Sequence, residues 1–155
     1  MQSPDREPLV LKRLLQDLWS ACTESVPFQG EQFLFVADAI IANPAAVAHI
    51  HCAEALGIPV HIMSTNPCRP TTSYRHPNTT ILRSNIHFRV NNFRSYFLVD
   101  SMGKRGGLGQ VIDTFREHTL KLPPLHPSGV LAAMDKRRIP TTHLYSARLL
   151  PRALD

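Results

Sequence analysis

The chain has 155 residues, 43% of them hydrophobic, and a formal net charge of +5, which suits one domain with a single core. No apolar run approaches the ~18–20 residues that a membrane-spanning helix needs. The N-terminal residues are typical neither of a signal peptide nor of a transit sequence. The three cysteines, Cys22, Cys52 and Cys68, lack metal-like spacing, so we expect a reduced, cytoplasmic protein without a metal site.

The first predicted element is an amphipathic helix over Pro8–Cys22. Its apolar stripe, widened by Trp19, comprises Leu11, Leu14, Leu15, Leu18 and Cys22. The opposite side carries Lys12, Arg13, Gln16 and Asp17. Pro27–Gln32 is then predicted to be a loop, so that residues 1–32 form a helix and a lead-in to the first strand.

Residues 38–65 read as a strand, a helix and a second strand. Asp38–Ala42 is a short apolar run, and Ile58–Met63 is another. Between them, Asn43 is predicted to cap a helix whose first residue is Pro44 and which Gly57 ends. This order implies parallel strands joined by a right-handed crossover, hence an α/β fold.

Ligands of parallel sheets collect where the strands end. The carboxyl ends of these two strands carry Asn43, Pro44, Ser64, Thr65, Asn66 and Pro67. We therefore expect a binding site at this edge of the sheet. His49 is expected to line the same cleft, from the second turn of the predicted helix.

Residues 67–92 are predicted to form a long loop with short strand-like pieces at 80–82 and 87–90. The chain has no acidic residue between Glu54 and Asp100, yet this stretch contains the cationic or titratable residues Arg69, Arg75, Arg83, Arg89, Arg94, His61, His76 and His87. A solvated basic loop is the favoured interpretation. Contact with an anionic membrane is an alternative, whereas no nucleic-acid module is visible and no nucleic-acid partner is expected.

The remaining pattern is mostly helical. Helices are predicted around residues 93–102 and over Leu108–Leu120, the second from its i, i+3, i+4, i+7 apolar spacing. The glycine-rich run between them follows a helix and lacks the Lys-Ser/Thr pair of a phosphate loop, so it is read as a helix–helix joint. A short helix at Gly129–Lys136 and a last strand at Thr142–Ser146 complete the chain.

Single candidates for chemistry are weak. His49 and His51 would point about 200° apart on a helix, which argues against a shared metal ion. Cys68 has no assignable partner for a nucleophile, and Glu54 is expected to face solvent. His76 has two interpretations, orienting a hydroxyl of a bound ligand or, more often for a lone histidine, pinning its loop.

Several motifs in sequence order resemble sterol glycosyltransferases. They are ADAIIANP at 37–44, HIHCAEALGIPVHIMSTNPCRPT at 49–71, YRHP at 74–77, SY at 95–96 with GLGQVI at 107–112, and IP at 139–140 with HLYSA at 143–147. The resemblance runs from about Phe35 to Pro151. It implies the amino-terminal half of a two-domain GT-B fold, with an incomplete Rossmann-like parallel sheet flanked by helices.

The resemblance also implies a function. That family transfers a hexose from a UDP-sugar to the hydroxyl of a sterol or similar lipid, and its amino-terminal domain holds the acceptor. By this resemblance residues 33–151 are a partial acceptor domain and 152–155 begin the interdomain linker. The residues expected to contact the acceptor are Asn43, Pro44, His49, Thr65, Pro67, Tyr74 and His76.

The chain also departs from the family pattern. Ser64 and Cys68 replace two aromatic residues that would pack a sterol. No Gly-rich first strand, general base or donor-binding domain is recognised, so no catalytic residue is assigned, no cofactor is expected in this chain, and transfer by the chain alone is not expected. The missing first strand would leave a central sheet edge unpaired, for a second chain or further domain to complete. A lipid- or membrane-binding module peripheral to the membrane, and a degenerate unstable fragment, are the alternatives.

Overall fold

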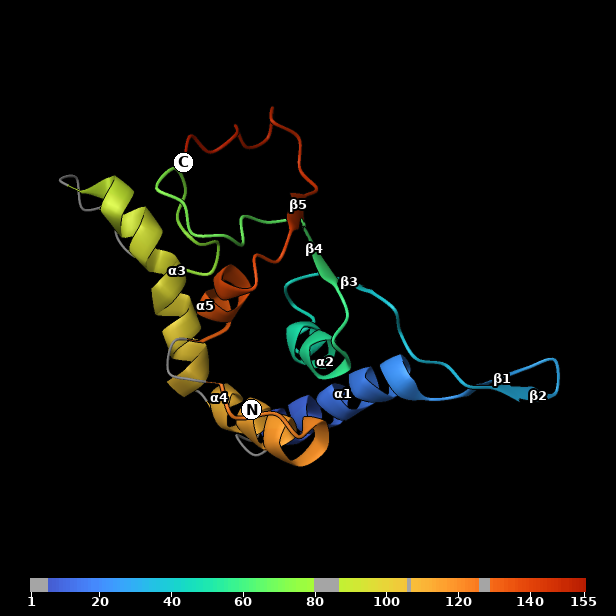
Figure 1. Ribbon diagram of the computed structural model, residues 1–155. Coiled ribbons are helices and arrows are strands. Elements are labelled where there is room, and N and C mark those ends of the chain that lie inside the picture. Colours follow the sequence, from blue (N-terminus) through green and yellow to red (C-terminus); the bar gives the residue numbers. More distant parts are fainter. Residues whose placement is uncertain (1–5, 80–86, 106, 126–128) are drawn as a thin grey trace.

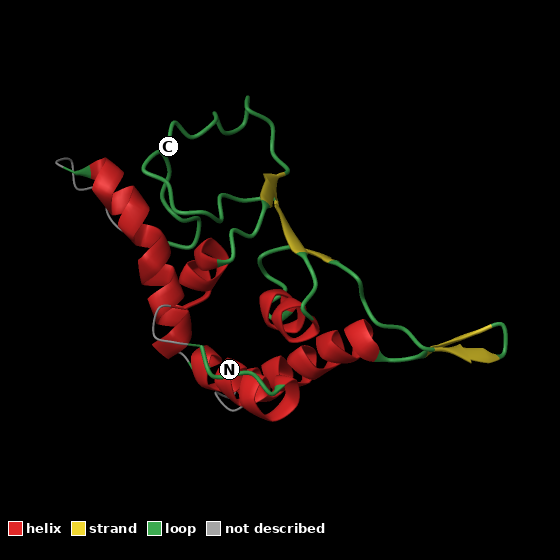
Figure 2. Ribbon diagram, viewed as in Figure 1, coloured by secondary structure: helices red, strands yellow, loops and turns green. Residues whose placement is uncertain are grey.

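The computed structural model describes residues 6–79, 87–105, 107–125 and 129–155 (Figure 1). A three-stranded parallel sheet of order β3-β4-β5 is formed by Ile40–Ala42, Val60–Ser64 and Thr141–His143. Helices flank this sheet, as Figure 2 shows. The predicted α/β class, with a small Rossmann-like parallel sheet, is confirmed.

The strand–helix–strand unit forms as predicted in its essentials. β3 and β4 run parallel, with Ile40 opposite Val60 and Ala42 opposite Ile62. The connecting helix α2 (His49–Leu56) ends at Gly57, whose φ of 66° lies in the left-handed region that a residue without a Cβ adopts at little cost.

The predicted start of this helix is wrong by five residues. Asn43 does accept a hydrogen bond from the backbone N–H of Ala45 (3.0 Å), but the chain turns there instead of entering a helix. The Asn43 amide also donates to the carbonyl of Met63 on β4 (3.4 Å), which holds the residue at the strand end. Two successive turns follow, with the N–H of Ala46 bonded to Asn43 and that of His49 bonded to Ala46. The hydrogen bond from Asn43 to the neighbouring strand therefore outweighs the local capping signal.

The helix α1 (Arg6–Thr23) packs the amphipathic stripe against α2 and α4. Leu15 is fully buried in a cluster that contains Cys52, Ile112 and Phe115, and Leu11, Leu18, Trp19 and Cys22 border the cluster. Leu14 is the exception, because it is 42% exposed. A second cluster, Ile50, Ile62, Met134 and Ile139, lies between α2, β4 and α5 (Gly129–Lys136). Helix α2 is thus buried between two cores.

The predicted loop at Pro27–Gln32 is a hairpin. Strands β1 (Val26–Phe28) and β2 (Glu31–Phe33) pair antiparallel around Gln29 and Gly30, which both have positive φ. Two consecutive positive φ values are typical of the tight turns that join antiparallel strands. The hairpin projects away from the helices in Figure 1.

The second half departs from the prediction at two points, of which one is the last strand, predicted at Thr142–Ser146 but formed by β5 at Thr141–His143. Residues 87–90, predicted to be strand-like, instead begin the long helix α3 (Phe88–Arg105), with the N–H of Asn91 bonded to His87. The other such piece, at 80–82, lies outside the described residues. Helix α4 (Leu108–Phe115) continues as a π-helical turn, Arg116–Leu120, which together match the predicted span. Gly107, with φ 87°, forms the predicted joint between α3 and α4.

One edge of β3 is unpaired in the described part of the chain, and several apolar residues on and before this strand are exposed. Within the described ranges no strand pairs with β3 on the side away from β4. The residues that precede it, Phe33–Val36, are 43–93% exposed, and Ile41 on β3 is 72% exposed. The open sheet edge expected from the sequence is therefore present in this part of the chain. Among the described helices, none combines the length and apolarity that crossing a membrane requires.

Candidate functional site

A cavity of about 1010 Å³ opens at the carboxyl ends of the strands. Its walls come from the segments after β3 and β4, from the loop at His76–Asn78, and from α3, α4 and the start of α5. The helices contribute apolar residues such as Leu108 and Ile112 together with the acidic residues Asp100, Asp113 and Glu117. Volumes of about 300–1000 Å³ are usual for sites that enclose a small organic ligand.

The strand ends are held together by polar side chains. Asn43 bonds across from β3 to Met63 on β4, and the buried Ser64 hydroxyl donates to the carbonyl of Asn66 (2.6 Å). These bonds shape the turn Thr65–Pro67, which forms one wall of the cavity. The edge predicted from the topology is thus the edge where the cavity lies.

Six of the seven residues expected to contact an acceptor line this cavity: Asn43, Pro44, His49, Thr65, Pro67 and His76. Tyr74 does not line it, and its hydroxyl donates to the carbonyl of Pro151 near the C-terminus. What these residues bind stays a prediction. Sequence reasoning missed the helical half of the wall, where Val99 and Asp113 lie. No local signal marks these positions, since they reach the cavity only through packing of α3 and α4.

His49 occupies the first position of α2 and its side chain is almost completely buried. Its Nδ1 bonds to the carbonyl of Ala46, three residues earlier. Burial lowers the pKa of His49, although the bond to Ala46 acts in the opposite direction. The ring is therefore neutral near pH 7, with Nδ1 as the donor. Its position at the start of α2, rather than in the second turn, still places it in the cavity wall.

His76 anchors the loop after β4. Its backbone N–H donates to the Ser95 hydroxyl (2.7 Å), and its Nδ1 accepts from the N–H of Asn78 (3.1 Å). Its ring lies edge-on to Tyr96, with centroids 5.2 Å apart. These contacts support the interpretation that His76 pins its loop to α3, while its place in the wall leaves contact with a ligand open.

Cys68 lies in the cavity wall as a free cysteine. Burial raises the pKa of the Cys68 thiol, and this effect outweighs the bond to Ser64 that lowers it. A neutral thiol is a poor nucleophile. The geometry therefore gives no support to covalent chemistry at this residue.

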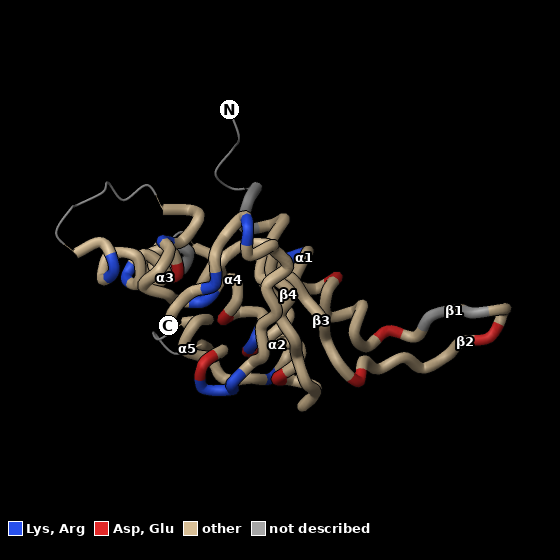
Figure 3. Tube along the Cα trace, turned by 90° about the horizontal axis from the view of Figure 1, so that it is seen from above, with Lys and Arg blue, Asp and Glu red and all other residues tan. Residues whose placement is uncertain are grey.

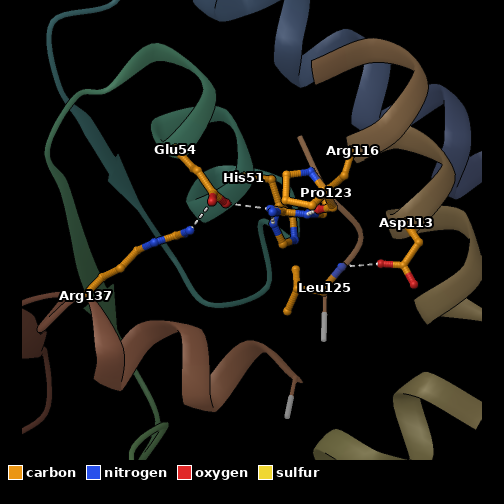
Figure 4. A network of polar contacts seen from close by, with 7 residues as sticks. All are labelled: His51, Glu54, Asp113, Arg116, Pro123, Leu125 and Arg137. Atoms are coloured by element: carbon orange, nitrogen blue, oxygen red, sulfur yellow. Dashed lines mark hydrogen bonds and ion pairs between the residues drawn. The ribbon is translucent and has the colours of Figure 1, made fainter. Parts of the chain in front are cut away.

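A partly buried ionic network joins α2 to the π-helical turn and to the turn after α5 (Figure 4). Arg116, only 4% exposed, donates to Glu54 Oε2 (2.6 Å), to His51 Nδ1 (3.0 Å) and to the carbonyl of Pro123 (2.8 Å). Arg137 on the turn after α5 pairs with the other oxygen of Glu54. The prediction that Glu54 faces solvent is wrong, because its carboxylate joins α2 to the π-helical turn and to α5.

The basic stretch is only partly solvated. Arg69 pairs with Asp135 (3.0 Å), whereas Arg89 and Arg94 lie exposed on α3. Figure 3 shows basic positions recurring along α3. Arg83 lies outside the described residues.

The fold is an α/β domain with a cavity at its strand ends, and comparisons with known proteins give its relatives. No protein-family profile matches the chain. Two sterol 3-beta-glucosyltransferases of Arabidopsis thaliana are 36% and 34% identical to it, each over 94% of its length. A sterol 3-beta-glucosyltransferase of Yarrowia lipolytica is 31% identical over the same share. The resemblance seen in the motifs is thereby confirmed, and the chain is a homologue of one segment of sterol glycosyltransferases.

The similarity concerns a part of each relative. The chain spans 21% and 22% of the two Arabidopsis proteins and 9% of the Yarrowia protein. A terpene cyclase-glycosyl transferase fusion protein of Humicola fuscoatra is also similar, 30% identical over 76% of this chain and 9% of its own length. The match thus corresponds to a partial domain.

Proposed function

We propose that this chain is the acceptor-binding part of a sterol-type glycosyltransferase, with residues 33–151 as the acceptor domain. The observation that carries the proposal is the cavity of about 1010 Å³ at the strand ends, lined by residues of the motifs that are shared with the family. The apolar residues of the wall suit the rings of a sterol or similar lipid, and the polar residues among them suit its hydroxyl. The names of the relatives support a sterol acceptor and a hexosyl donor.

Sugar transfer requires the donor and the acceptor to be held together. The described residues offer no assigned general base, and the relatives are several times longer than the matched segment. We propose that the UDP-sugar binds to a region outside this segment and that the chain alone binds acceptor without transferring hexose. Incubation of the chain with a sterol and UDP-glucose should yield no steryl glucoside, whereas product formation would contradict this part of the proposal.

Filling the cavity should abolish acceptor binding. Ala45 lines the cavity yet is exposed, so Ala45→Trp adds bulk to the wall without disturbing a core. We expect the affinity for dehydroergosterol, a fluorescent sterol, to fall at least about tenfold, because the indole would occupy space that the ligand needs. Energy transfer from Trp19, the only native tryptophan, reports binding in the wild type.

The matched control for this variant is Ala39→Trp, at an exposed alanine that does not line the cavity. Because both variants add a second donor, affinities are compared by sterol fluorescence with direct excitation. Equal affinity of the two variants would place the sterol elsewhere. A wild-type chain without a cooperative thermal transition would instead favour the third interpretation, a degenerate fragment.

A lipid- or membrane-surface binding module is the second candidate, and one surface favours it. Helix α3 exposes several large apolar side chains, between 41% and 63% exposed, which are Phe88, Val90, Phe93, Phe97, Leu98 and Met102. The exposed Arg89 and Arg94 lie on the same helix. Apolar and cationic groups together suit an anionic bilayer surface. Val99 and Asp100 of α3 also line the cavity, so a bilayer at this helix would lie beside the proposed lipid site.

Removing two aromatic rings from this surface should weaken membrane binding. Phe93 and Phe97 lie one turn apart with centroids at 5.3 Å. The double variant Phe93→Ser and Phe97→Ser should bind anionic vesicles at least about tenfold more weakly, since each ring contributes ~1.5–3 kcal/mol when fully buried. Co-sedimentation with vesicles of phosphatidylserine and phosphatidylcholine measures this. The control is Leu9→Ser with Val10→Ser on α1, where both residues are 67% exposed. An equal loss of vesicle binding in both double variants would show that α3 is not the membrane-binding surface.

A further inference from the structure

The charges of the chain are separated along the sequence. No lysine or arginine lies between Arg13 and Arg69, while that stretch contains the acidic residues Asp17, Glu24, Glu31, Asp38 and Glu54. The stretch between Glu54 and Asp100 is the reverse, because it contains arginines and no acidic residue. Each stretch also contributes a surface with exposed apolar side chains, so the molecule has two such surfaces of opposite charge.

The acidic stretch forms a surface beside the unpaired edge of the sheet, which we name the edge surface. It runs from β2 to β3, and its exposed members are Glu31, Phe33, Leu34, Phe35, Val36, Asp38 and Ile41. In the described part of the chain no strand pairs with this edge of β3. Large apolar side chains that gather beside an unpaired strand mark a place where another chain docks.

The basic stretch contributes the complementary surface on α3, which we name the helix surface. Its exposed members are Phe88, Arg89, Val90, Phe93, Arg94, Phe97, Leu98 and Met102. The acidic residue of α3, Asp100, is half-buried and lines the cavity. The edge surface thus combines apolar side chains with anions, and the helix surface combines them with cations. An apolar contact with opposite charges around it is the pattern of a specific protein interface.

The two surfaces lie at opposite ends of the molecule. In Figure 1 the hairpin of β1 and β2 projects to the right and α3 lies on the left, and Figure 3 shows the same separation from above. The surfaces therefore do not meet within one molecule, but a second copy brings one onto the other. A contact between two different surfaces is head-to-tail, so it repeats into a closed ring or an open chain.

We propose that the chain self-associates head to tail, with the edge surface of one copy docked on the helix surface of the next. The occupant is a second copy because the chain itself supplies both the apolar and the charged complement of each surface. The apolar side chains provide the affinity. Glu31 and Asp38 fix the orientation against Arg89 and Arg94, since exposed ion pairs contribute little free energy but select the partner surface. The inference goes beyond acceptor binding and does not depend on it.

Sedimentation velocity of the wild-type chain in lipid-free buffer measures the association directly. We expect a dissociation constant below about 100 μM at low ionic strength, and an association about 3- to 10-fold weaker at about 1 M salt, because salt screens exposed charges. A chain that stays monomeric at that concentration, or one whose association strengthens with salt, overturns the inference.

Charge reversal tests which surfaces meet. Glu31→Lys with Asp38→Lys reverses the edge surface, and Arg89→Glu with Arg94→Glu reverses the helix surface. Each double variant alone should associate at least about tenfold more weakly than the wild type, because like charges then face each other. An equimolar mixture of the two should associate again, since each reversed surface then meets its opposite. A mixture that stays monomeric while the wild type associates overturns the inference.

The matched control is Lys12→Glu with Arg13→Glu, which makes the same change in net charge as the α3 variant at exposed positions of α1. It should associate as the wild type does. A loss as large as that of the α3 variant would show that net charge, and not the helix surface, governs the association, and would overturn the inference.

An anionic bilayer is the rival occupant of the helix surface. The edge-surface variant leaves α3 intact, so it should keep its binding to vesicles of phosphatidylserine and phosphatidylcholine while it loses self-association. Loss of vesicle binding in the α3 variant, together with a wild type that stays monomeric without lipid, would assign the helix surface to the bilayer. That outcome overturns this inference, while acceptor binding in the cavity still stands.

Discussion

Replacing Arg116 with methionine should lower the free energy of unfolding by about 1–3 kcal/mol, because the buried His51 loses its donor and Glu54 loses one of its two cationic partners. Methionine fills similar volume but cannot donate to Glu54, His51 or the carbonyl of Pro123, which Arg116 bonds simultaneously. Total stabilities of about 5–15 kcal/mol are usual for a domain, so this loss is a large share. Urea unfolding followed by far-UV circular dichroism measures it.

Arg137→Met is the matched control. Arg137 binds the other oxygen of the same carboxylate, but its side chain is 35% exposed against 4% for Arg116. Exposed pairs contribute little, so this variant should lose less than about 1 kcal/mol. Similar losses in the two variants would mean that the network does not brace α2 against the π-helical turn.

The sequence predicted the elements whose signals are local. Gly57 ended α2 where its positive φ was expected, and the helix at Gly129–Lys136 formed with the predicted bounds. The parallel pairing of β3 with β4 followed from the strand–helix–strand order alone. In each case the residues that decide the structure are neighbours in the chain.

The predictions failed where a contact between residues far apart in the sequence determines the local structure. Asn43 and Pro44 carry a strong helix-start signal, yet the bond from Asn43 to Met63, twenty residues away, keeps the chain in a turn. Residues 88–90 join α3, and the Asn92 amide ties that helix to the carbonyl of Thr72. The hairpin around Gln29 and Gly30 had a weak local signal, a glycine in a two-residue turn, but its second strand, Glu31–Phe33, is mostly polar and exposed.

The same distinction holds for the cavity. Its strand-end half could be predicted because parallel topology places ligands there. Its helical half depends on how α3 packs against α4, and the pairing of Glu54 with Arg116 over 62 positions depends on how the π-helical turn packs against α2. Periodicity shows that a helical face is buried but does not show which residue of another helix it meets.

The second large effect concerns pH. Burial, with a contribution from the neighbouring Arg116, lowers the pKa of His51 from 6.5 to about 3. In the unfolded chain His51 regains a pKa near 6.5, so between these values the unfolded state binds more protons and stability falls as pH falls. From pH 7 to pH 5 this one group should cost about 2 kcal/mol of unfolding free energy. His51→Asn keeps an acceptor for Arg116 and does not titrate, so its stability should depend less on pH in this window.

Glu54 affects stability at lower pH than His51 does, so the contributions of the two residues can be measured separately. Burial alone would raise the pKa of Glu54, but its bonds to Arg116 and Arg137 hold it below the ordinary 4.5. Its contribution is present above that value and is lost only as pH falls further. Urea unfolding at pH 7, 6 and 5 therefore reports mainly on the buried histidines, and His49→Gln measures the share of His49. An unchanged slope in His51→Asn would show that His51 is not held neutral by the fold.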